Sequence, residues 1–289
     1  MAIQFKSQSA VPGASSALRS LPRAGDRSPS APRAADPSAP SAGRDGVSIL
    51  GVPFAALHFD EAVERIRAML HSAASHQVVI ANAHTLNFAC THPVYRRVLE
   101  RASLVLRDGV GVEVAAALHG RRLPHNFVGT DFVPALLERL AQPEVRVFLY
   151  GAQPGVAEAA AEALRARCPS IRVTGLQHGY ENGAAPVERI RAARPDVLLV
   201  ALGNPLQEHW IAEHLEQLGV RVAIGVGALF DYLAGRVPRA PGWVRRLRGE
   251  WLFRLAVEPR RLWRRYLVGN AQFLWRVVRA TARSNGAAS

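Results

Sequence analysis

The stretch Val197-Leu-Leu-Val-Ala-Leu-Gly-Asn-Pro-Leu-Gln-Glu208 decides the fold. Its first five residues are all apolar, which is typical of a strand that is buried on both faces. Gly203-Asn204-Pro205 follows as a turn, and Pro205 is the residue type favoured at the first position of a helix. The pattern therefore predicts a buried strand that passes through a glycine-containing turn into a helix.

The same strand and turn unit recurs along the chain. Apolar segments from Gln77 to Ala81, Arg146 to Tyr150 and Val220 to Gly225 each run into small or polar residues. Stretches with helical spacing separate these segments, and such alternation indicates a parallel sheet with helices on both faces. We therefore expect an α/β fold whose ligands bind beyond the carboxyl ends of the strands.

The N-terminal 45 residues differ from the rest of the chain. They are mostly Ser, Ala, Pro, Gly and Arg, with too few large apolar residues to offset the entropy of ordering. We predict a disordered tail over residues 1–45 and an α/β domain over 46–242. The first helix of that domain is expected from Asp60 to about Ala73, with Asp60 as its N-cap.

The formal charge of +13 over 289 residues is concentrated at the two ends. Residues 1–45 hold six Lys and Arg against three Asp and Glu, residues 236–289 hold thirteen against two, and the middle is nearly neutral. No apolar run reaches the length of about 18 residues that a membrane span needs, so any membrane attachment is expected to be peripheral. The two cysteines lie far apart and predict neither a disulfide framework nor a metal site, as is usual in a reducing cytoplasm.

The turns after the predicted strands bring small residues and free backbone N–H groups to helix starts, where phosphate or carboxylate groups bind. None has the dinucleotide pattern G-x-G-x-x-G, because Phe230 stands where Gly225 and Gly227 would require a third glycine. A Walker A sequence is also absent. Each turn taken alone is equally explained by packing.

Polar residues follow two of the strands. Asn82-Ala-His-Thr-Leu-Asn87 supplies amides, a hydroxyl and an imidazole that could bind a sugar, although the pattern alone favours Asn82 and Thr85 as caps of the next helix. Asp108 ends the apolar segment that begins at Leu104, where a carboxylate could act as a general base. The alternatives for Asp108 are a turn residue or a partner of the neighbouring Arg107.

Two further groups have simple structural explanations. Gly129-Thr130-Asp131 precedes a predicted helix, and Thr130 or Asp131 would serve as its N-cap. Gln207 and Glu208 are expected in a first helical turn that faces the site, where Glu208 would also complement the helix dipole.

The chain changes character from Arg236 onward. Tryptophans alternate with arginines there, and after Pro259 apolar residues recur at helical spacing, which predicts a basic amphipathic helical appendage over residues 243–289. We favour binding to an anionic membrane surface. Single-stranded nucleic acid is one alternative, and a helix pair packed on the core or on another subunit, with its tryptophans buried, is the other.

Six motifs, taken together and in this order, resemble the WecG/TagA/CpsF glycosyltransferases over about residues 47–280. They are Asn82-Ala-His-Thr-Leu-Asn87, Leu106-Arg-Asp-Gly-Val-Gly111, Gly129-Thr-Asp131, Gly203-Asn-Pro-Leu-Gln-Glu208, Gly225-Val-Gly-Ala-Leu-Phe-Asp231, and Glu250-Trp-Leu-Phe-Arg-Leu255 followed by Glu258-Pro-Arg-Arg261.

The resemblance implies an inverting, metal-independent transferase with a Rossmann-like domain and no cofactor, peripheral on the cytoplasmic face of the membrane. Its partners would be a UDP-sugar donor and an undecaprenyl-diphosphate-linked saccharide acceptor, in exopolysaccharide or other cell-surface polysaccharide synthesis. The sugar would be N-acetylmannosamine, its uronic acid, or glucose. A homo-oligomer is compatible with the family, and nucleic acid is not expected as a partner.

The resemblance also implies roles for individual residues. Asp108 matches the catalytic base, while Arg254, Arg261 and Arg264 match arginines of an appendage that closes over the site and contacts the diphosphate. The resemblance likewise implies Thr85 and Asn87 as the polar pair of the substrate-binding pocket and Gln207 as a residue of that pocket. We further assign Thr130 and Asp131 to substrate binding, and we assign to the donor nucleotide or diphosphate Tyr180, Gly203, Gly227 and Asp231.

Two other function classes stay open on the sequence alone. A nucleotide-dependent oxidoreductase or epimerase could use a similar sheet, although the missing dinucleotide pattern disfavours it. A non-enzymatic basic module that binds membrane or nucleic acid would need only the C-terminal segment.

Overall fold

A computed structural model describes residues 46–140, 144–181, 184–246 and 249–286, apart from the side chains of residues 245, 261 and 284–286. The predicted tail over residues 1–45 lies outside this part of the chain. A six-stranded, wholly parallel sheet forms the centre, in the order β4-β3-β8-β7-β5-β6. Its strands are β3 (His76–Ala81), β4 (Leu104–Arg107), β5 (Val145–Gly151), β6 (Ile171–Gln177), β7 (Val197–Ala201) and β8 (Val222–Gly225).

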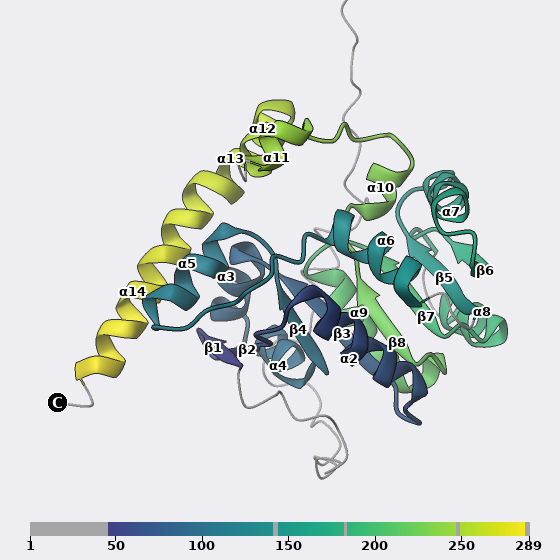
Figure 1. The fold of residues 1–289 in the computed structure, drawn as a ribbon, viewed down its shortest axis with the longest axis horizontal. Coiled ribbons are helices and arrows are strands. Elements are labelled where there is room, and N and C mark those ends of the chain that lie inside the picture. The colour runs from purple at the N-terminus through teal and green to yellow at the C-terminus, as the bar shows by residue number, and fades with distance from the viewer. Residues whose placement is uncertain (1–45, 141–143, 182–183, 247–248, 287–289) are drawn as a thin grey trace, which may run out of the picture.

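Helices cover both faces of the sheet, as the sequence predicts (Figure 1). One face packs against α2 (Phe59–His71), α6 (Gly129–Leu140), α7 (Val156–Arg167) and α10 (Leu229–Leu233). The other face packs against α3 (Ala83–Thr91), α4 (Pro93–Arg101), α5 (Val110–Leu118), α8 (Ala185–Ala193), α9 (Leu206–Leu218) and the hairpin of β1 (Val47–Ile49) and β2 (Val52–Phe54).

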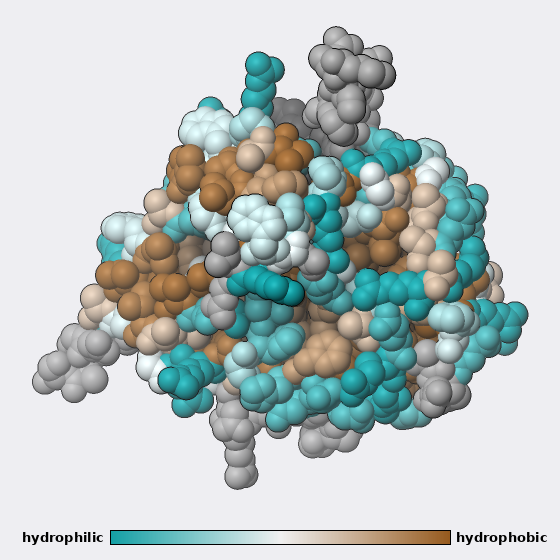
Figure 2. All heavy atoms as spheres, turned by 45° about the horizontal axis from the view of Figure 1, so that its top comes forward, coloured by the Kyte–Doolittle hydropathy of each residue, from teal (hydrophilic) through white to brown (hydrophobic). Residues whose placement is uncertain are grey.

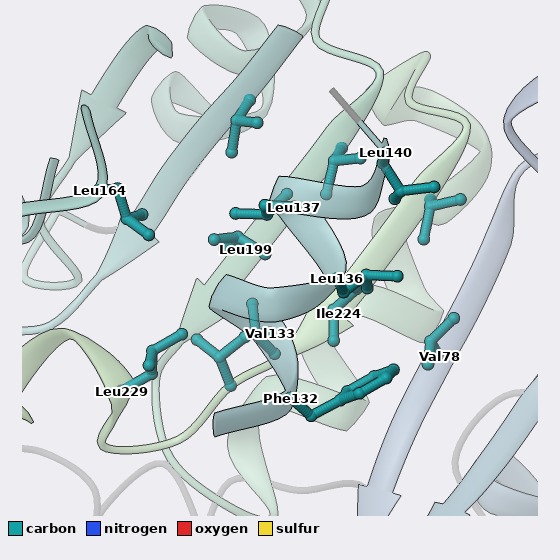
Figure 3. Packing of buried hydrophobic residues seen from close by; sticks show 14 of the residues in the cluster. Val78, Phe132, Val133, Leu136, Leu137, Leu140, Leu164, Leu199, Ile224 and Leu229 are labelled. Carbon is teal, nitrogen blue, oxygen red and sulfur yellow. The ribbon is translucent and has the colours of Figure 1, made fainter. Parts of the chain in front are cut away.

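Alternation along each strand divides the core into these two layers. Val78 points toward α6 and its neighbours, whereas Val79 points to the opposite face, because successive strand residues face opposite ways. Figure 3 shows α6 lying over the strands, with Phe132, Val133 and Leu136 directed into the sheet. The sheet is therefore buried on both sides, which explains its continuous apolar strands.

Two predicted helix starts are wrong by one or two residues. Helix α2 begins at Phe59 with His58 as its N-cap, so Asp60 lies in the first turn and forms an ion pair with Arg139 (2.6 Å). Helix α9 begins at Leu206, and Pro205 occupies the N-cap position instead of the first helical position.

The C-terminal segment is helical, and it packs across the second face of the sheet at its β4 end. It comprises α11 (Gly242–Arg246), α12 (Glu250–Val257), α13 (Pro259–Trp263), the π-helix η1 (Arg264–Val268) and α14 (Gly269–Gly286). Phe273 and Val277 of α14 are fully buried, and Phe273 lies against Gly111 of α5, where an added Cβ would be 3.6 Å from the ring. The opposite side of α14 exposes Leu274, Trp275 and Val278. The boundary at residue 243 stays a prediction.

The helices within the described ranges include none with both the length and the apolar composition needed to cross a bilayer.

We predict that Phe273→Ala lowers the free energy of unfolding by about 3 kcal/mol, because it removes a fully buried aromatic side chain and leaves a cavity. Urea unfolding followed by circular dichroism measures the loss. Leu274→Ala, on the exposed side of the same helix, is the control and should change stability by less than about 1 kcal/mol. Equal unfolding midpoints for the two variants would contradict the packing described for α14.

Candidate active site

Asp108 lies at the carboxyl edge of the sheet, directly after β4. Its backbone N–H donates to the carbonyl of Ala81 (2.8 Å), which extends the pairing of β3 and β4 by one residue. Gly109 then adopts φ +89° and donates its N–H to Oδ1 of Asn126 (2.7 Å). A Cβ at Gly109 would meet nothing within 4 Å, so the space beside this turn is open.

The surroundings of Asp108 shift its ionisation toward neutral pH. Burial raises the pKa of this carboxyl to about 6, and the negative charge of Glu250 adds to the rise. A hydrogen bond from Asn82 and the positive charges of Arg254 and Arg265 act in the opposite direction. A carboxyl that titrates near the operating pH is suited to general-base catalysis.

Arg107, the sequence neighbour of Asp108, is directed elsewhere. Its buried guanidinium donates to the carbonyl of Leu123 (3.1 Å) and forms an ion pair with Glu113 of α5 (3.1 Å). These contacts give Arg107 a structural role in joining β4 to α5.

The turn after β3 forms a helix cap. Asn82 Oδ1 accepts hydrogen bonds from the backbone N–H groups of His84 (3.1 Å) and Thr85 (3.3 Å), and Thr85 Oγ1 accepts from the N–H of Asn82 (3.3 Å). The capping interpretation of Asn82 and Thr85 is therefore confirmed. Thr85 is buried, and its hydroxyl also accepts from Asn204 (3.4 Å), so it connects the turns that follow β3 and β7.

Asn87 links α3 to the C-terminal helices. Its Nδ2 donates to the carbonyl of Gly269 (2.6 Å), and its Oδ1 accepts from Arg276 (2.8 Å). Asn87 thus lies on a groove of about 520 Å³ between α3 and the segment formed by η1 and α14. The groove is lined by His84, Asn87, Phe88, Thr91, Arg264, Arg265, Val268, Gly269, Gln272 and Arg276.

The groove combines positive charge with neutral polar groups. Arg264, Arg265 and Arg276 line one side, and His84 lies opposite on α3. Burial, followed by the charge of Arg265, lowers the pKa of His84 to about 4, so the imidazole is neutral at pH 7 and both donates and accepts hydrogen bonds. This arrangement suits a ligand that carries both phosphate and sugar hydroxyl groups.

Gln207 and Glu208 are buried beneath the turns after β7 and β8. Gln207 donates to Glu208 (2.7 Å) and accepts from the N–H of Gly227 (2.9 Å). Glu208 also accepts from Tyr95 (3.2 Å) and Asn204 (3.1 Å). Burial raises the pKa of Glu208, while these hydrogen bonds oppose the rise. Both residues therefore fix the shape of the two turns.

The turns that Gln207 and Glu208 support face open space. Gly203 has φ +81° and Gly227 has φ +55°, and a Cβ added to either would meet nothing within 4 Å. Glycine is required by the backbone conformation at both positions, and its small size lets a ligand approach the main chain. Asn204 adds a buried Oδ1 that has no hydrogen-bond partner within the described residues, which is typical of an atom that meets a ligand or water.

Residues of α10 and α12 complete the site beside Asp108. The guanidinium of Arg254 lies 5.5 Å from the ring centre of Tyr232. Nε of Arg254 and the hydroxyl of Tyr232 are both buried and have no hydrogen-bond partner in the part of the chain that the structure describes. Asp231 precedes Tyr232, and its carbonyl accepts from the N–H groups of Arg236 (2.9 Å) and Val237 (3.3 Å).

Sequence reasoning missed four residues of this site, namely Asn204, Tyr232, Glu250 and Arg265. Asn204 and Glu250 stand inside the quoted motifs, and Tyr232 and Arg265 each directly follow a predicted site residue. The signal that could have found them was therefore adjacency to the motifs. Of the predicted appendage arginines, Arg254 and Arg264 lie at the site or groove, and the side chain of Arg261 is outside the described residues.

Thr130 and Asp131 do not cap α6 as predicted, because the helix already begins at Gly129. Both lie in its first turn and contact Arg239, which donates to Thr130 Oγ1 (3.4 Å) and forms an ion pair with Asp131. They hold the segment that leads into the C-terminal helices.

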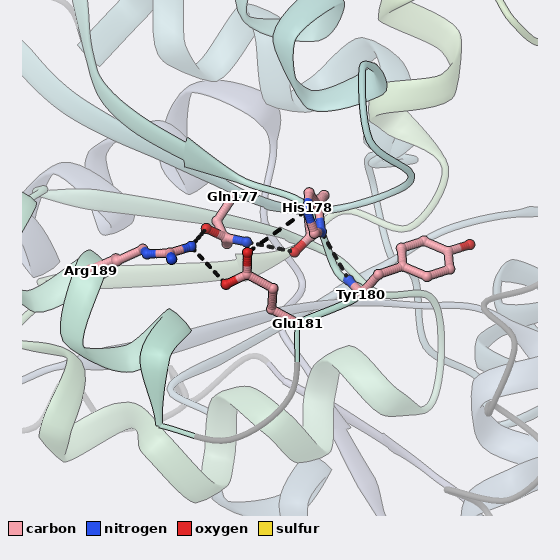
Figure 4. Close-up of polar contacts among 5 residues, drawn as sticks. All are labelled: Gln177, His178, Tyr180, Glu181 and Arg189. Atoms are coloured by element: carbon pink, nitrogen blue, oxygen red, sulfur yellow. Dashed lines mark hydrogen bonds and ion pairs between the residues drawn. The ribbon is translucent and has the colours of Figure 1, made fainter.

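Tyr180 belongs to a separate polar cluster after β6 (Figure 4). Arg189 contacts Gln177 and Glu181 there, and the N–H of Tyr180 donates to His178 (3.3 Å), while the tyrosine ring extends away from the others. Strand β6 is the edge of the sheet opposite β4. After β6 the chain turns back over the end of β5, where the N–H of Gly179 donates to the carbonyl of Ala152 (3.0 Å), and the placement of Tyr180 in the donor site stays a prediction.

Among the residues that the structure describes, no group of three or more His, Cys, Asp or Glu side chains is placed to hold a metal ion.

We predict that Asp108→Asn stabilises the protein at pH 7.5 by about 1 to 3 kcal/mol, since each pKa unit corresponds to about 1.4 kcal/mol. The folded pKa of Asp108 lies above its ordinary value of 3.8, so protonation stabilises the folded state. This contribution is complete below pH 4 and is lost as the pH rises through 6. Urea unfolding at pH 4 and 7.5 tests the prediction, which fails if the variant is the less stable protein at both.

Comparison with known proteins shows the family of this chain. The profile of the Glycosyl transferase WecG/TagA/CpsF family matches residues 47–287. An N-acetylglucosaminyldiphosphoundecaprenol N-acetyl-beta-D-mannosaminyltransferase from Bacillus spizizenii strain W23 is 37% identical over 191 residues, which are 66% of this chain and 74% of the relative. The enzyme of the same name from Staphylococcus aureus strain MRSA252 is 33% identical over 238 residues, which are 81% of this chain and 92% of the relative. The chain therefore belongs to the WecG/TagA/CpsF family of glycosyltransferases.

Proposed function

We propose that this glycosyltransferase moves N-acetylmannosamine from a UDP-sugar to N-acetylglucosaminyldiphosphoundecaprenol, with Asp108 as the general base. The names of the two relatives supply the sugar and the acceptor. The observation that carries the chemistry is a carboxyl with a pKa of about 6 at the edge of the sheet, next to the open turn at Gly109 and within the influence of two arginines.

In the proposed reaction, Asp108 accepts the proton of an acceptor hydroxyl while the hydroxyl oxygen forms a bond to the anomeric carbon of the donor sugar. The bond from that carbon to the β-phosphate oxygen breaks, and its electron pair leaves with UDP. Attack opposite the leaving group converts an α-linked donor into a β-linked product. The base requires an ionised carboxyl, which predominates above pH 6.

The donor diphosphate fits the region between the open turns and α12. Gly203 and Gly227 let phosphate oxygens approach the main chain closely at the start of α9 and beyond β8. Arg254 lies nearby with a buried Nε that has no hydrogen-bond partner within the described ranges. A guanidinium there would offset the charge that develops on UDP as it leaves. Asp231 and Arg261 stay assigned to the same proposed donor site, whereas Arg264 lines the groove between α3 and α14.

The acceptor fits the groove between α3 and α14. Its three arginines suit the acceptor diphosphate, while His84 and Asn87 offer hydrogen bonds to the sugar. The lipid chain of such an acceptor stays in a bilayer, so the protein must work at a membrane surface. Exposed Trp243, Trp251, Trp263 and Trp275 on the C-terminal helices fit peripheral binding to the cytoplasmic face.

We predict that Asp108→Asn lowers turnover about 10²- to 10⁴-fold, because general-base assistance is lost. Purified protein would be mixed with UDP-N-acetylmannosamine, its uronic acid or UDP-glucose and a polyprenyl-diphosphate-linked N-acetylglucosamine, and UDP release and product mass recorded. The wild-type kcat should rise with pH through about 6. Asp60→Asn, which changes an exposed carboxylate of α2, is the matched control and should keep full activity.

Full activity of Asp108→Asn would contradict the proposed base. Turnover with another donor sugar, but not with UDP-N-acetylmannosamine, would contradict the proposed sugar and leave Asp108 as the base.

We also predict that Arg254→Ala lowers kcat about 10²-fold, with a smaller effect on KM, because the charge on departing UDP is greatest in the transition state. Arg254→Lys should recover part of the loss, since it keeps the charge without the planar fork. Arg165→Ala, at an exposed position of α7, is the control. Unchanged kcat in Arg254→Ala would exclude Arg254 from leaving-group stabilisation.

A further inference from the structure

Helix α5 follows the proposed catalytic base almost directly. Asp108 directly follows β4, Gly109 forms the turn, and α5 runs from Val110 to Leu118. Val110, Val114 and Leu118 recur at intervals of four residues on one side of the helix, and they are 37, 40 and 46% exposed. A rigid element with an exposed aliphatic face is thus attached next to the reacting group.

This face of α5 carries no charge. The helix has a single ionisable side chain, Glu113, and that carboxylate forms an ion pair with the buried Arg107 (3.1 Å). Val112, Ala115 and Ala116 fill the core on the opposite side. Single exposed aliphatic residues are common on protein surfaces, whereas a charge-free row of them marks an interaction site.

The row on α5 adjoins the exposed side of α14. The two helices pack together through Gly111 and Phe273, and α14 exposes Leu274, Trp275 and Val278 to solvent. Figure 1 places α5 and α14 side by side on the left of the molecule, and Figure 2 shows a hydrophobic patch on that side. Residues of the α/β domain and of the C-terminal helices therefore form one apolar surface.

Arginines border this surface. Arg121 and Arg122 follow α5 and are exposed, and Arg279 of α14 lies with its guanidinium 5.1 Å from the ring centre of Trp275. An aliphatic centre with tryptophan and arginine at its edge matches a bilayer surface, where acyl chains lie beneath anionic headgroups. A protein partner of equal size would need opposite charge at the arginines.

We propose that α5 is a second membrane-contacting helix, supplied by the α/β domain itself, and that its contact with the bilayer fixes the height of Asp108 above the headgroups. Gly109 is the sole residue between Asp108 and the helix, so the carboxyl keeps a set distance from whatever α5 binds. The consequence for catalysis rests on the proposed lipid-linked acceptor, whereas the membrane contact itself does not.

The membrane contact can be tested with site-specific labels. In a Cys90→Ser background, which removes the exposed native thiol, an environment-sensitive fluorophore would be attached to Leu118→Cys or to Val94→Cys. Val94 is the matched control, since it is 38% exposed but lies on α4. Vesicles that contain phosphatidylglycerol should shield the Leu118→Cys label from an aqueous quencher and leave the Val94→Cys label accessible. Equal quenching of both labels by added vesicles would overturn the proposal.

The consequence for catalysis needs a second pair of variants. Val114→Ser with Leu118→Ser should lower vesicle affinity about tenfold, because two aliphatic side chains lose their apolar contact. Turnover should fall in parallel for a long-chain acceptor embedded in vesicles and change less than about twofold for a short-chain acceptor in solution. Val94→Ser should alter neither.

The outcomes separate the two proposals. Absence of turnover by the wild type with every acceptor would contradict the proposed function, while the labels still report on α5. Unchanged vesicle affinity in the double variant would contradict the membrane role of α5. If, in addition, the wild type sediments as a dimer and the double variant as a monomer, the surface is an interface between two copies of this chain.

Discussion

The burial of Phe273 and Val277 in the core is the interaction on which the rest of the site depends. These two side chains hold α14 against α3 and α5, and Asn87 adds hydrogen bonds to Gly269 and Arg276. Only with α14 in this position do η1 and α12 lie close enough to Asp108 for Arg254, Arg265 and Glu250 to act on its charge. Apolar packing some distance from the carboxyl therefore determines its electrostatics.

The balance of charges around Asp108 explains why its carboxyl titrates near pH 6. A bidentate arginine partner would have lowered the pKa below its ordinary value, and burial without any cation would have raised it further. Here burial and Glu250 raise the pKa, and Asn82, Arg254 and Arg265 limit the rise. Because three of these groups belong to the C-terminal helices and Asn82 belongs to the turn after β3, the basicity of Asp108 depends on both parts of the chain.

Local patterns predicted the elements well, and contacts between distant residues account for what they missed. Val197–Ala201 is the strand expected from its apolar run, and Asn82 caps α3 as its residue type suggests. The strand order, however, depends on packing across the whole domain, so the sequence could not show that β6 lies at the edge of the sheet opposite β4, the strand that Asp108 follows. Thr130 and Asp131 resembled a cap, but their partner Arg239 lies more than 100 residues along the chain.

The C-terminal helices also show why amphipathicity alone left their role open. A surface helix needs one apolar side, yet α14 has two, with Phe273 and Val277 in the core and Leu274, Trp275 and Val278 outside. Packing on the core accounts for the first side but leaves Trp275 59% exposed. This exposure is contrary to the alternative in which the core buries the tryptophans.

The tryptophan rings also bear on the nucleic-acid alternative. Arg264 and Arg279 lie over the rings of Trp263 and Trp275, so these rings are partly occupied by the protein's own cations and less available to stack with nucleic-acid bases. The outer side of α14 therefore fits the proposed contact with a membrane, and its neighbour α5 extends the same apolar character to the helix that follows Asp108.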